Sequence, residues 1–325
     1  MNKIIAVTIG DIEGIGIEIL IKLFKSKKNN KFILFTNYKI FKKYLFDKKI
    51  NVKIKIANNN LNELQKLDYN NSINIFDFKC KTKIENTYNS LIESYKLTKL
   101  KFFIGILTLP INKEIIINNI DSEFIGQTEF FQKIDKKKNV NMLFIHNNLR
   151  ILTLTTHIEF KKILNTLVKK NFIYNKILNL NKVFKKDLNL PSPKMIISGI
   201  NPHASENSTI GNEEKKIILP ILNKLRKIKL HIDGPYSADS LLINKNKKYD
   251  VFIFHYHDQA LIPFKLLSKN KGINFTAGLD IIRVSPDHGT AYDIVGKNIA
   301  NTKGLINCFN FIKKIAKNRD IIVNS

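Results

Sequence analysis

Three apolar segments of the sequence are each followed closely by a histidine. RILTLTTH ends at His157, KMIISGINPH ends at His203, and DVFIFHYH ends at His257. Runs of β-branched and aromatic residues without polar alternation are typical of strands buried on both faces, and ligands of open α/β sheets gather beyond the carboxyl ends of such strands. Three imidazoles that converge there would hold a divalent cation and leave positions open for substrate oxygens. The sequence does not fix the order of the strands, so three separate strand exits with ordinary structural histidines are the alternative.

Several acidic residues near these histidines could take part in the same chemistry. Asp239, Asp258 and Asp287 are candidates for further metal ligands, for partners that orient an imidazole, and for a catalytic base, although each could equally be a turn residue or a helix cap. In the segment PDHGTAYDIVGK, Asp287, His288 and Gly289 stand before an expected helix. The first backbone N–H groups of such a helix could hold an anionic group, and a role as helix cap is the alternative for His288.

Cationic and amide side chains follow the third histidine at regular intervals. Lys265, Asn274 and Arg283 occur in the segments FK, GINFT and IIRVS. Such a group suits an anionic substrate, because arginine can grip a phosphate or a carboxylate through two hydrogen bonds.

Strand and helix signals alternate along the chain, which predicts an α/β fold with a largely parallel sheet. Strands are expected at residues 3–8, 32–36, 51–57, 102–109, 150–157 and 194–200. The residues Phe160, Ile163, Leu164 and Leu167 are spaced as one apolar helix face, and Pro220 predicts a kink or boundary in a helix over residues 211–228. The expected division is a first α/β domain of residues 1–125 and 290–325 and a second of residues 126–289.

The composition excludes several classes of protein. The formal charge is +27, but only four of the 54 basic residues are arginine, and the lysines are spread over the whole chain. Because base and phosphate recognition relies on arginine, this pattern favours a drift in composition over a built nucleic-acid surface, which stays the weakest alternative. Two cysteines are too few for a disulfide framework or a cysteine-based zinc site. The short apolar run before Asp11 predicts neither a signal peptide nor a membrane span, so a cytoplasmic location is expected.

Longer motifs connect these candidate residues to a known family. The chain contains T-x-G-D-x-x-G-I-G-x-E, G-x-T-E-F-F, T-T-H, N-P-H-A-x-E, G-P-x-x-A-D-S-L, Y-H-D-Q-A-L-I-P-x-K and I-R-x-S-P-D-H-G-T-A-Y-D-I-x-G. In this order they resemble the 4-hydroxythreonine-4-phosphate dehydrogenase family over nearly the whole chain. The resemblance implies the fold of the isocitrate and isopropylmalate dehydrogenases, with two α/β domains around a cleft. It also implies a homodimer with its site at the interface, in which the second domain carries the metal ligands and the dimer contacts.

The resemblance also implies roles for individual residues. It makes His157, His203 and His257 the ligands of a divalent metal (Zn, or Co, Mg or Mn) and places Asp239 in the site. The residues implied to contact the phosphorylated substrate are Gln127, Thr128, Lys265, Asn274 and Arg283. Lys265 is also a candidate for catalysis beside Asp239 and Asp258, which are the first candidates for the base, and the loop of Asp287, His288 and Gly289 is the candidate for binding the cofactor.

The implied reaction belongs to vitamin B6 synthesis. NAD takes a hydride from the carbon that bears the 3-hydroxyl of 4-phosphooxy-L-threonine, and the resulting β-keto acid loses carbon dioxide to leave 3-amino-2-oxopropyl phosphate. Two alternatives use the same scaffold. One is a decarboxylating dehydrogenase of a four-carbon sugar-acid phosphate, such as 4-phospho-threonate or 4-phospho-erythronate. The other is a non-catalytic, degraded homologue that binds phosphorylated ligands.

The sequence departs from the family pattern at three positions. Gln127 stands where histidine is usual, and because glutamine carries no charge at neutral pH, we expect weaker substrate binding rather than a dead enzyme. Leu109 replaces a small residue and could crowd the backbone around Lys113. Ser205 stands where glycine is common.

Overall fold

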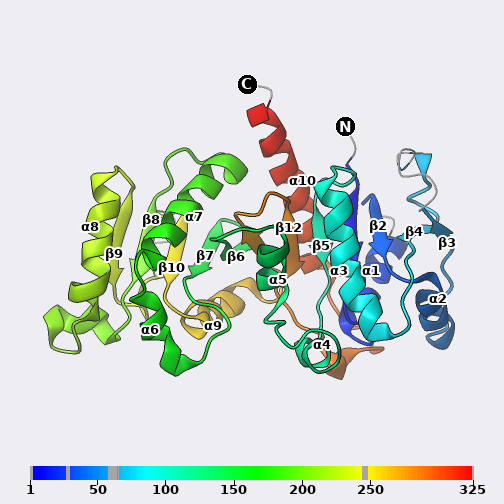
Figure 1. Ribbon diagram of the computed structural model, residues 1–325, viewed down its shortest axis with the longest axis horizontal. Coiled ribbons are helices and arrows are strands. Elements are labelled where there is room, and N and C mark those ends of the chain that lie inside the picture. The colour runs from blue at the N-terminus through cyan, green and yellow to red at the C-terminus, as the bar shows by residue number, and fades with distance from the viewer. Residues whose placement is uncertain (1–2, 27–29, 58–63, 65, 244–247, 324–325) are drawn as a thin grey trace. The chain divides into compact units, whose positions relative to one another are not determined.

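The computed structural model describes residues 3–26, 30–57, 64, 66–243 and 248–323 (Figure 1). The chain divides into two compact units. The first contains the residues up to Phe130 together with Asp280–Lys317, and the second contains Phe131–Leu279 and the residues from Asn318 onward. The domain boundaries expected from the sequence were near residues 125 and 289, and the whole carboxyl-terminal segment was assigned to the first domain.

The first unit contains a parallel sheet. Its strands, in spatial order, are β3 (Ile54–Ile56), β4 (Ile73–Phe76), β2 (Phe32–Phe35), β1 (Ile5–Thr8), β5 (Ile106–Thr108) and β12 (Arg283–Pro286). Its helices include α1 (Ile15–Lys25), α2 (Tyr38–Asp47), α3 (Lys83–Lys99) and α4 (Lys113–Asn119). Asn37, Thr82 and Asn112 cap three of these helices, each by accepting a hydrogen bond from a backbone N–H of the first turn. The caps fix where each helix begins after its strand.

The second unit contains a mixed sheet. Its strands, in spatial order, are β11 (Ile273–Ala277), β6 (Asn141–His146), β7 (Leu149–Thr153), β10 (Val251–Phe254), β8 (Met195–Ser198) and β9 (Ile232–Tyr236). The pairs β7–β10, β10–β8 and β8–β9 are parallel, whereas β11–β6 and β6–β7 are antiparallel. Its helical segments include α7 (Phe172–Leu188), η3 (Pro202–Ser208), η4 (Glu214–Ile218), α8 (Leu219–Lys227) and α9 (His257–Ser268). The mixed α/β fold predicted from the sequence is confirmed.

A buried apolar cluster holds α9 against the sheet of the second unit. Phe252 and Phe254 of β10 pack with Phe264 of α9, with Phe144 of β6, and with Leu241. Burying a phenylalanine side chain of this kind contributes about 1.5–3 kcal/mol. The start of α9, which carries His257, is therefore fixed relative to β10.

The carboxyl end of the last helix belongs to the second unit. In α10 (Lys303–Val323), Arg319 donates from Nε to Oδ1 of Asp187 at 2.8 Å and from Nη2 to Oδ2 at 3.0 Å. Asn318 donates to the backbone carbonyl of Asp187 at 2.6 Å. Because Asp187 is buried, this two-point ion pair is well shielded from solvent, and it explains why residues from Asn318 onward depart from the expected division.

One predicted helix face is wrong. Residues 160–167 form two short segments, η2 (Phe160–Lys162) and α6 (Ile163–Leu167), instead of one amphipathic helix. Leu167 is buried, but Phe160 is 77% exposed and Leu164 39% exposed. The segment is too short to form a continuous apolar stripe. Pro220 does mark a boundary as predicted, since it lies in the first turn of α8, directly after the π-helical turn η4.

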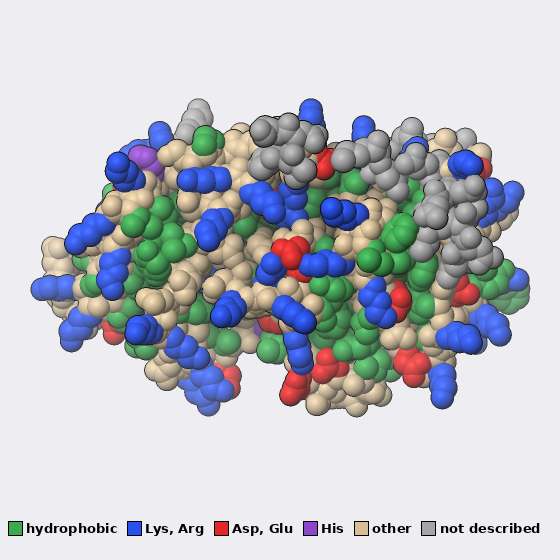
Figure 2. Space-filling model, turned by 45° about the horizontal axis from the view of Figure 1, so that its top comes forward, with side chains coloured by type: hydrophobic (Ala, Val, Ile, Leu, Met, Phe, Trp, Pro, Cys, Tyr) green, Lys and Arg blue, Asp and Glu red, His purple; other side chains and the backbone are tan. Residues whose placement is uncertain are grey.

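The surface and the helices bear on two other expectations. Lysine and arginine side chains are scattered over the face drawn in Figure 2 and do not gather over one element. None of the helices in the described ranges is both long and apolar enough to cross a membrane.

Candidate functional site

The strand order brings the three histidine-bearing strand ends together. β10 lies between β7 and β8 and runs parallel to both. His157, His203 and His257 follow Thr153, Ser198 and Phe254, the last residues of these three strands. Since the carboxyl ends of parallel neighbours meet at one edge of a sheet, all three histidines leave the sheet at the same edge. The sequence alone could not establish this adjacency.

A hydrogen-bond network ties these strand ends to one another. The backbone N–H and hydroxyl of Thr155 both donate to the carbonyl oxygen of His255, at 3.1 and 2.8 Å. The His255 ring donates from Nε2 to the carbonyl oxygen of Ser198 at 2.8 Å. Gln259 accepts from the His255 backbone N–H at 2.9 Å and donates to the Gly199 carbonyl at 3.0 Å. The positions of all three strand exits therefore depend on His255 and Gln259. Sequence reasoning missed the role of Gln259, although it belongs to the motif Y-H-D-Q.

His255 is structural and is not a candidate ligand. Its side chain is fully buried, and burial lowers the pKa of its imidazole to about 4, while the hydrogen bond to Ser198 partly opposes that shift. It is therefore neutral at physiological pH.

His157 and His257 form a close pair of imidazoles. Their ring centroids are 5.9 Å apart, and Nδ1 of His257 lies 2.6 Å from Oδ1 of Asp258. A carboxylate on Nδ1 fixes the tautomer and leaves Nε2 available to a metal, as in many carboxylate–histidine metal sites. Asp258 therefore orients His257 in this structure.

His203 lies near Asp239. The pKa of the Asp239 carboxyl is held below its usual range by hydrogen bonds from the Ser237 hydroxyl and the Ser240 backbone, with a smaller contribution from the charge on His203. The Ser237 bond measures 2.6 Å. Within the described ranges, no group of three or more His, Cys, Asp or Glu side chains is arranged as a ready metal site. The structure thus presents the predicted residues as two pairs at one sheet edge.

The segment that carries His203 has an unusual backbone. The φ angles of residues 203–208 lie between 40° and 74°, so this turn is left-handed throughout although it contains no glycine. The left-handed conformation costs about 1–2 kcal/mol for each residue other than glycine. The turn folds back on Gly199, where an added Cβ would lie 2.7 Å from Cα of Ala204. Strained backbone of this kind gathers at functional sites.

Lys265 and Asn274 belong to the second unit but are not gathered around His257. Lys265 lies on the last turn of α9 and is exposed. Its distance from His257 along the helix axis is about 12 Å, given a rise of about 1.5 Å per residue. Asn274 lies on β11, and its buried Oδ1 has no hydrogen-bond partner. The structure therefore does not bring Lys265 next to the histidine pair within the chain.

Arg283 is the centre of a buried polar group in the first unit. Its Nε and Nη2 donate to the Thr108 hydroxyl at 3.0 and 2.6 Å, and Nη1 donates to the Thr128 hydroxyl at 3.5 Å. Nη2 also donates to Oε1 of Gln127. Burial lowers the pKa of Arg283 to about 10, so it stays protonated at neutral pH. The structure thus brings together Gln127, Thr128 and Arg283, three of the five residues predicted to bind the substrate.

Gln127 and Leu109, two of the residues that depart from the family pattern, both lie near this group and contact it or its neighbours. Gln127 donates from Nε2 to the Leu109 carbonyl at 3.0 Å while its oxygen accepts from Arg283. Leu109 is buried, and a Cβ added at Gly10 or Gly16 would lie 2.7 or 3.1 Å from the Leu109 Cβ. The two glycines make room for the Cβ of Leu109, a contact that does not depend on its branched end.

The expected helix at Asp287, His288 and Gly289 is wrong. After β12 the chain enters a loop, and the next helical segment is the three-residue turn η5 (Tyr292–Ile294). His288 is half-buried, and its Nδ1 lies 3.0 Å from the Gly289 carbonyl. A helix N-terminus therefore does not support anion binding here. A Cβ added at Gly289 would meet no atom within 4 Å, so the loop borders open space.

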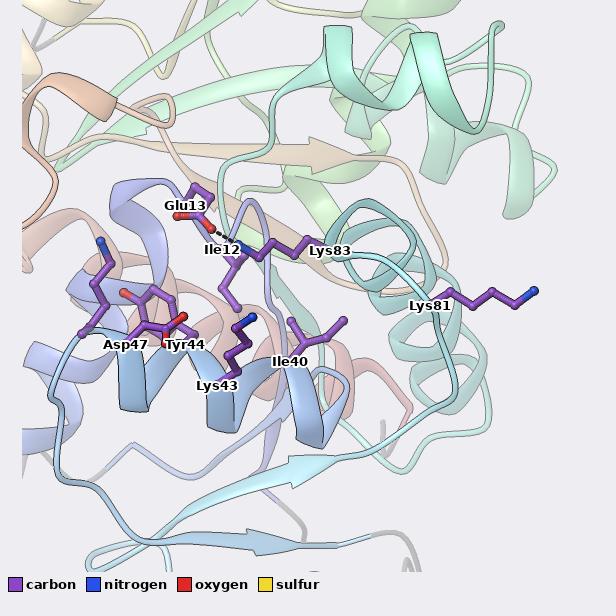
Figure 3. Close-up of a pocket in the computed structure, with 9 residues that line it drawn as sticks. Ile12, Glu13, Ile40, Lys43, Tyr44, Asp47, Lys81 and Lys83 are labelled. Atoms are coloured by element: carbon purple, nitrogen blue, oxygen red, sulfur yellow. Dashed lines mark hydrogen bonds and ion pairs between the residues drawn. The ribbon is translucent and has the colours of Figure 1, made fainter.

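A cavity of about 290 Å³ lies elsewhere in the first unit (Figure 3). It is lined by Ile12, Glu13, Ile40, Lys43, Tyr44, Asp47, Lys48, Lys81 and Lys83. Lys83 pairs with Glu13, and the Lys81 side chain points away from the cavity. Of its four lysines, Lys83 is thus paired and Lys81 is turned outward, whereas Lys43 and Lys48 line the cavity. None of the predicted site residues lines it.

Comparison with known proteins identifies the family. A family model described as "Pyridoxal phosphate biosynthetic protein PdxA" matches residues 28–312. The 4-hydroxythreonine-4-phosphate dehydrogenase of Sulfurihydrogenibium sp. is 35% identical over 316 residues, which cover 93% of this chain and 95% of that protein. The chain belongs to the PdxA family. It is an oxidoreductase, a dehydrogenase that acts in pyridoxal phosphate biosynthesis.

Further PdxA relatives and solved structures are similar over almost their whole lengths. The 4-hydroxythreonine-4-phosphate dehydrogenase of Aquifex aeolicus is 34% identical over 329 residues, which cover 97% of this chain and 99% of the relative. The crystal structure of that from Klebsiella pneumoniae is 25% identical, with a TM-score of 0.80, and the match covers 97% of this chain and 100% of that one.

The buried His255 makes stability depend on pH. The folded protein keeps His255 neutral down to about pH 4, whereas an unfolded histidine takes up a proton below about pH 6.5. The unfolded state therefore binds more protons between these values, and the folded state loses up to about 3 kcal/mol as the pH falls from about 6.5 to 4. Chemical denaturation across this range should show a flatter pH dependence for His255→Gln than for the wild type.

The control for this prediction is His231→Gln, which removes an exposed histidine from the same unit. It should keep the wild-type pH dependence. Parallel profiles for His255→Gln and the wild type would contradict the assignment of His255.

Proposed function

We propose that this PdxA protein catalyses the NAD-dependent oxidation and decarboxylation of 4-phosphooxy-L-threonine to 3-amino-2-oxopropyl phosphate, with a divalent metal held by His157, His203 and His257. The observation that carries the proposal is the order β7–β10–β8 of three mutually parallel strands, which puts three histidine-bearing strand ends at one edge of the mixed sheet. The reaction is that implied by the motifs and by the names of the relatives.

The residues at this edge suit a metal. His257 has its Nδ1 on Asp258, so its Nε2 is free to coordinate, and His157 is a near neighbour. Neutral imidazoles are ligands for Zn, Co or Mn, and Mg is a further candidate if substrate oxygens complete the coordination. When bound, such an ion supplies a Lewis acid that acidifies the substrate hydroxyl and withdraws electrons during decarboxylation.

Asp239 is the base that we assign to the hydroxyl proton. Its carboxyl is ionised at neutral pH, and because the lowered pKa also makes it a weaker base, its place near His203 is what supports this assignment. Asp258 is engaged with His257 and acts by orienting that ring. Lys265 is the remaining candidate for a proton donor in the step that follows decarboxylation, when the carbon that lost carbon dioxide must be protonated.

The substrate phosphate is assigned to Thr128, Gln127, Lys265, Asn274 and Arg283. Arg283 and Lys265 supply positive charge, and Thr128 supplies a hydroxyl beside Arg283. The unpaired Oδ1 of Asn274 can accept a hydrogen bond from the substrate ammonium group, whereas its amide nitrogen carries the donors that a phosphate needs. NAD is assigned to the loop of Asp287, His288 and Gly289, since that loop borders open space.

The proposed assembly is a homodimer in which Lys265 acts in the site of the partner. Lys265 is separated from His257 by most of α9, so it does not complete the histidine group of its own chain. Ile262 and Leu266 flank it on the same side of the helix and are 62% and 71% exposed. Large apolar side chains exposed together mark a surface that another chain covers.

The first test is formation of NADH from 4-phosphooxy-L-threonine by the purified protein before and after chelation. Activity should disappear with the chelator and return when a divalent ion is added back. Parallel assays use 4-phospho-threonate and 4-phospho-erythronate, which carry a hydroxyl in place of the amine. Faster turnover of these acids would move the assignment to a sugar-acid phosphate. Binding of NAD and substrate with no NADH under any metal would indicate a non-catalytic homologue.

Gln127→Ala tests the role of the amide that bridges Arg283 and Leu109. Losing this acceptor should raise the KM for the phosphorylated substrate about 10-fold, the effect of one hydrogen bond to a charged group, and leave kcat nearly unchanged. Gln132→Ala is the matched control, because Gln132 lies on the same helix, α5 (Gln127–Ile134), and donates only to the Lys138 carbonyl. An unchanged KM in Gln127→Ala would remove Gln127 from the binding group.

Gln127→His tests the expectation that the uncharged glutamine weakens binding. A lower KM is expected if a charge is missing at this position. Unchanged values of both KM and kcat would contradict that expectation.

Mixing two inactive variants tests whether Lys265 acts in the partner's site. His257→Ala and Lys265→Ala should each be inactive as homodimers. After subunit exchange, half of the dimers are mixed and each holds one intact site, so about a quarter of the wild-type activity should return. A mixture no more active than its components would show that Lys265 serves its own chain or that the chain does not dimerise.

A further inference from the structure

One buried carboxylate gathers the hydrogen-bond donors below the left-handed turn at residues 203–208. Glu214, the first residue of η4, is 3% exposed. Its Oε1 accepts from the backbone N–H groups of Ile200 and Asn201 at 2.7 and 2.8 Å. Its Oε2 accepts from Nδ2 of Asn201 at 2.9 Å and from the Ser205 hydroxyl. Glu214 therefore bonds both the segment that enters the turn and the middle of the turn.

The donor set requires a carboxylate at this position. All four contacts of Glu214 are donated to it, and only an ionised carboxylate offers two oxygens that both accept. A glutamine would direct its NH2 group either at the two backbone N–H donors or at Nδ2 of Asn201, so at least one donor would lose its contact with residue 214. The neighbouring Glu213 accepts from Asn201 and from its own turn, and no hydrogen bond joins it to residues 203–208.

Ser205 links the carboxylate to the left-handed backbone. Its φ is 71°, a value that favours glycine, and it is buried. Its hydroxyl bonds Glu214, and its oxygen accepts from Nδ2 of Asn201 at 3.2 Å. The side chain that makes this conformation costly thus also supplies the bond that holds it.

We propose that Glu214 is a positioning residue for metal binding, because it holds the left-handed turn from which His203 projects at the sheet edge shared with His157 and His257. Glu214 does not contact the metal or the substrate. It acts through Ser205 and Asn201, which fix the backbone on either side of His203. The inference rests on the proposed function, in which His203 is a ligand.

The test is the affinity of the protein for Co²⁺, measured without substrate by the visible absorption of the bound ion and by equilibrium dialysis. Glu214→Gln should bind Co²⁺ about 10–100-fold more weakly than the wild type, the usual effect of losing a group that orients a ligand. Glu213→Gln is the matched control, since both contacts of Glu213 are made by the single oxygen Oε2, which a glutamine oxygen can replace, and its affinity should stay within about twofold of the wild type. An equal affinity in folded Glu214→Gln would overturn the proposal.

A second pair of variants covers the case in which Glu214→Gln does not fold. Ser205→Ala keeps the left-handed strain and removes the hydroxyl, so it should weaken Co²⁺ binding. Ser205→Gly removes the hydroxyl and the strain together and should bind more tightly than Ser205→Ala. Wild-type affinity in Ser205→Ala would overturn the proposal by itself.

The same titration separates this inference from the proposed function. A wild-type protein that does not bind Co²⁺, or one whose affinity is unchanged in His203→Ala, would remove His203 as a ligand and sink the proposed metal site. Binding that depends on His203 but not on Glu214 or Ser205 would leave the metal site standing and refute only the positioning role.

Discussion

The tie between the ends of β10 and β8 is the constraint on which the candidate site depends. His255 and Gln259 join β10 to Ser198 and Gly199, and Thr155 joins β7 to the same His255. The histidine in the middle of this network must be neutral, because its surroundings exclude water and contain no carboxylate bonded to the ring. A buried, uncharged imidazole thus fixes the strand ends after which the three candidate ligands follow, one of them exposed and two half-buried. The two histidines of the segment H-Y-H-D-Q therefore have different roles. His255 is buried and structural, whereas His257 is the candidate ligand.

The candidate residues of the two units lie in different electrostatic environments. In the first unit, Arg283 is buried among hydroxyl and amide oxygens, which compensate its charge through hydrogen bonds to neutral acceptors. In the second unit, His203 and Asp258 are exposed and His257 is half-buried. An exposed pair gains little from Coulomb attraction in water. The contact between His257 and Asp258 therefore contributes little to the stability of the fold. It matters because it selects which nitrogen of the His257 ring is free.

The fold class and the histidines could be predicted from the sequence, but their geometry could not. The strand at Val251–Phe254 is evident from four consecutive apolar residues, and His257 follows it directly. The position of β10 between β7 and β8 depends on contacts between residues far apart in the chain, which no local pattern reports. Positive φ angles at His203 and its neighbours carry no local sequence signal either, since glycine is absent from the turn. The apolar spacing at Phe160 was misleading because five residues of α6 are too few to bury a stripe.

The departures from the family pattern show how one site accommodates substitutions. The Cβ of Leu109 fits because Gly10 and Gly16 present no side chains to it. Ser205 strains the backbone at a left-handed position, but its hydroxyl bonds Glu214. Gln127 cannot carry the charge that a histidine could, but its amide bonds both the Leu109 carbonyl and Arg283. In each case the new side chain meets a complementary group already in place. A chain rich in lysine, asparagine and isoleucine can therefore keep a precise local geometry, because the geometry is held by backbone groups and buried acceptors and not by surface side chains.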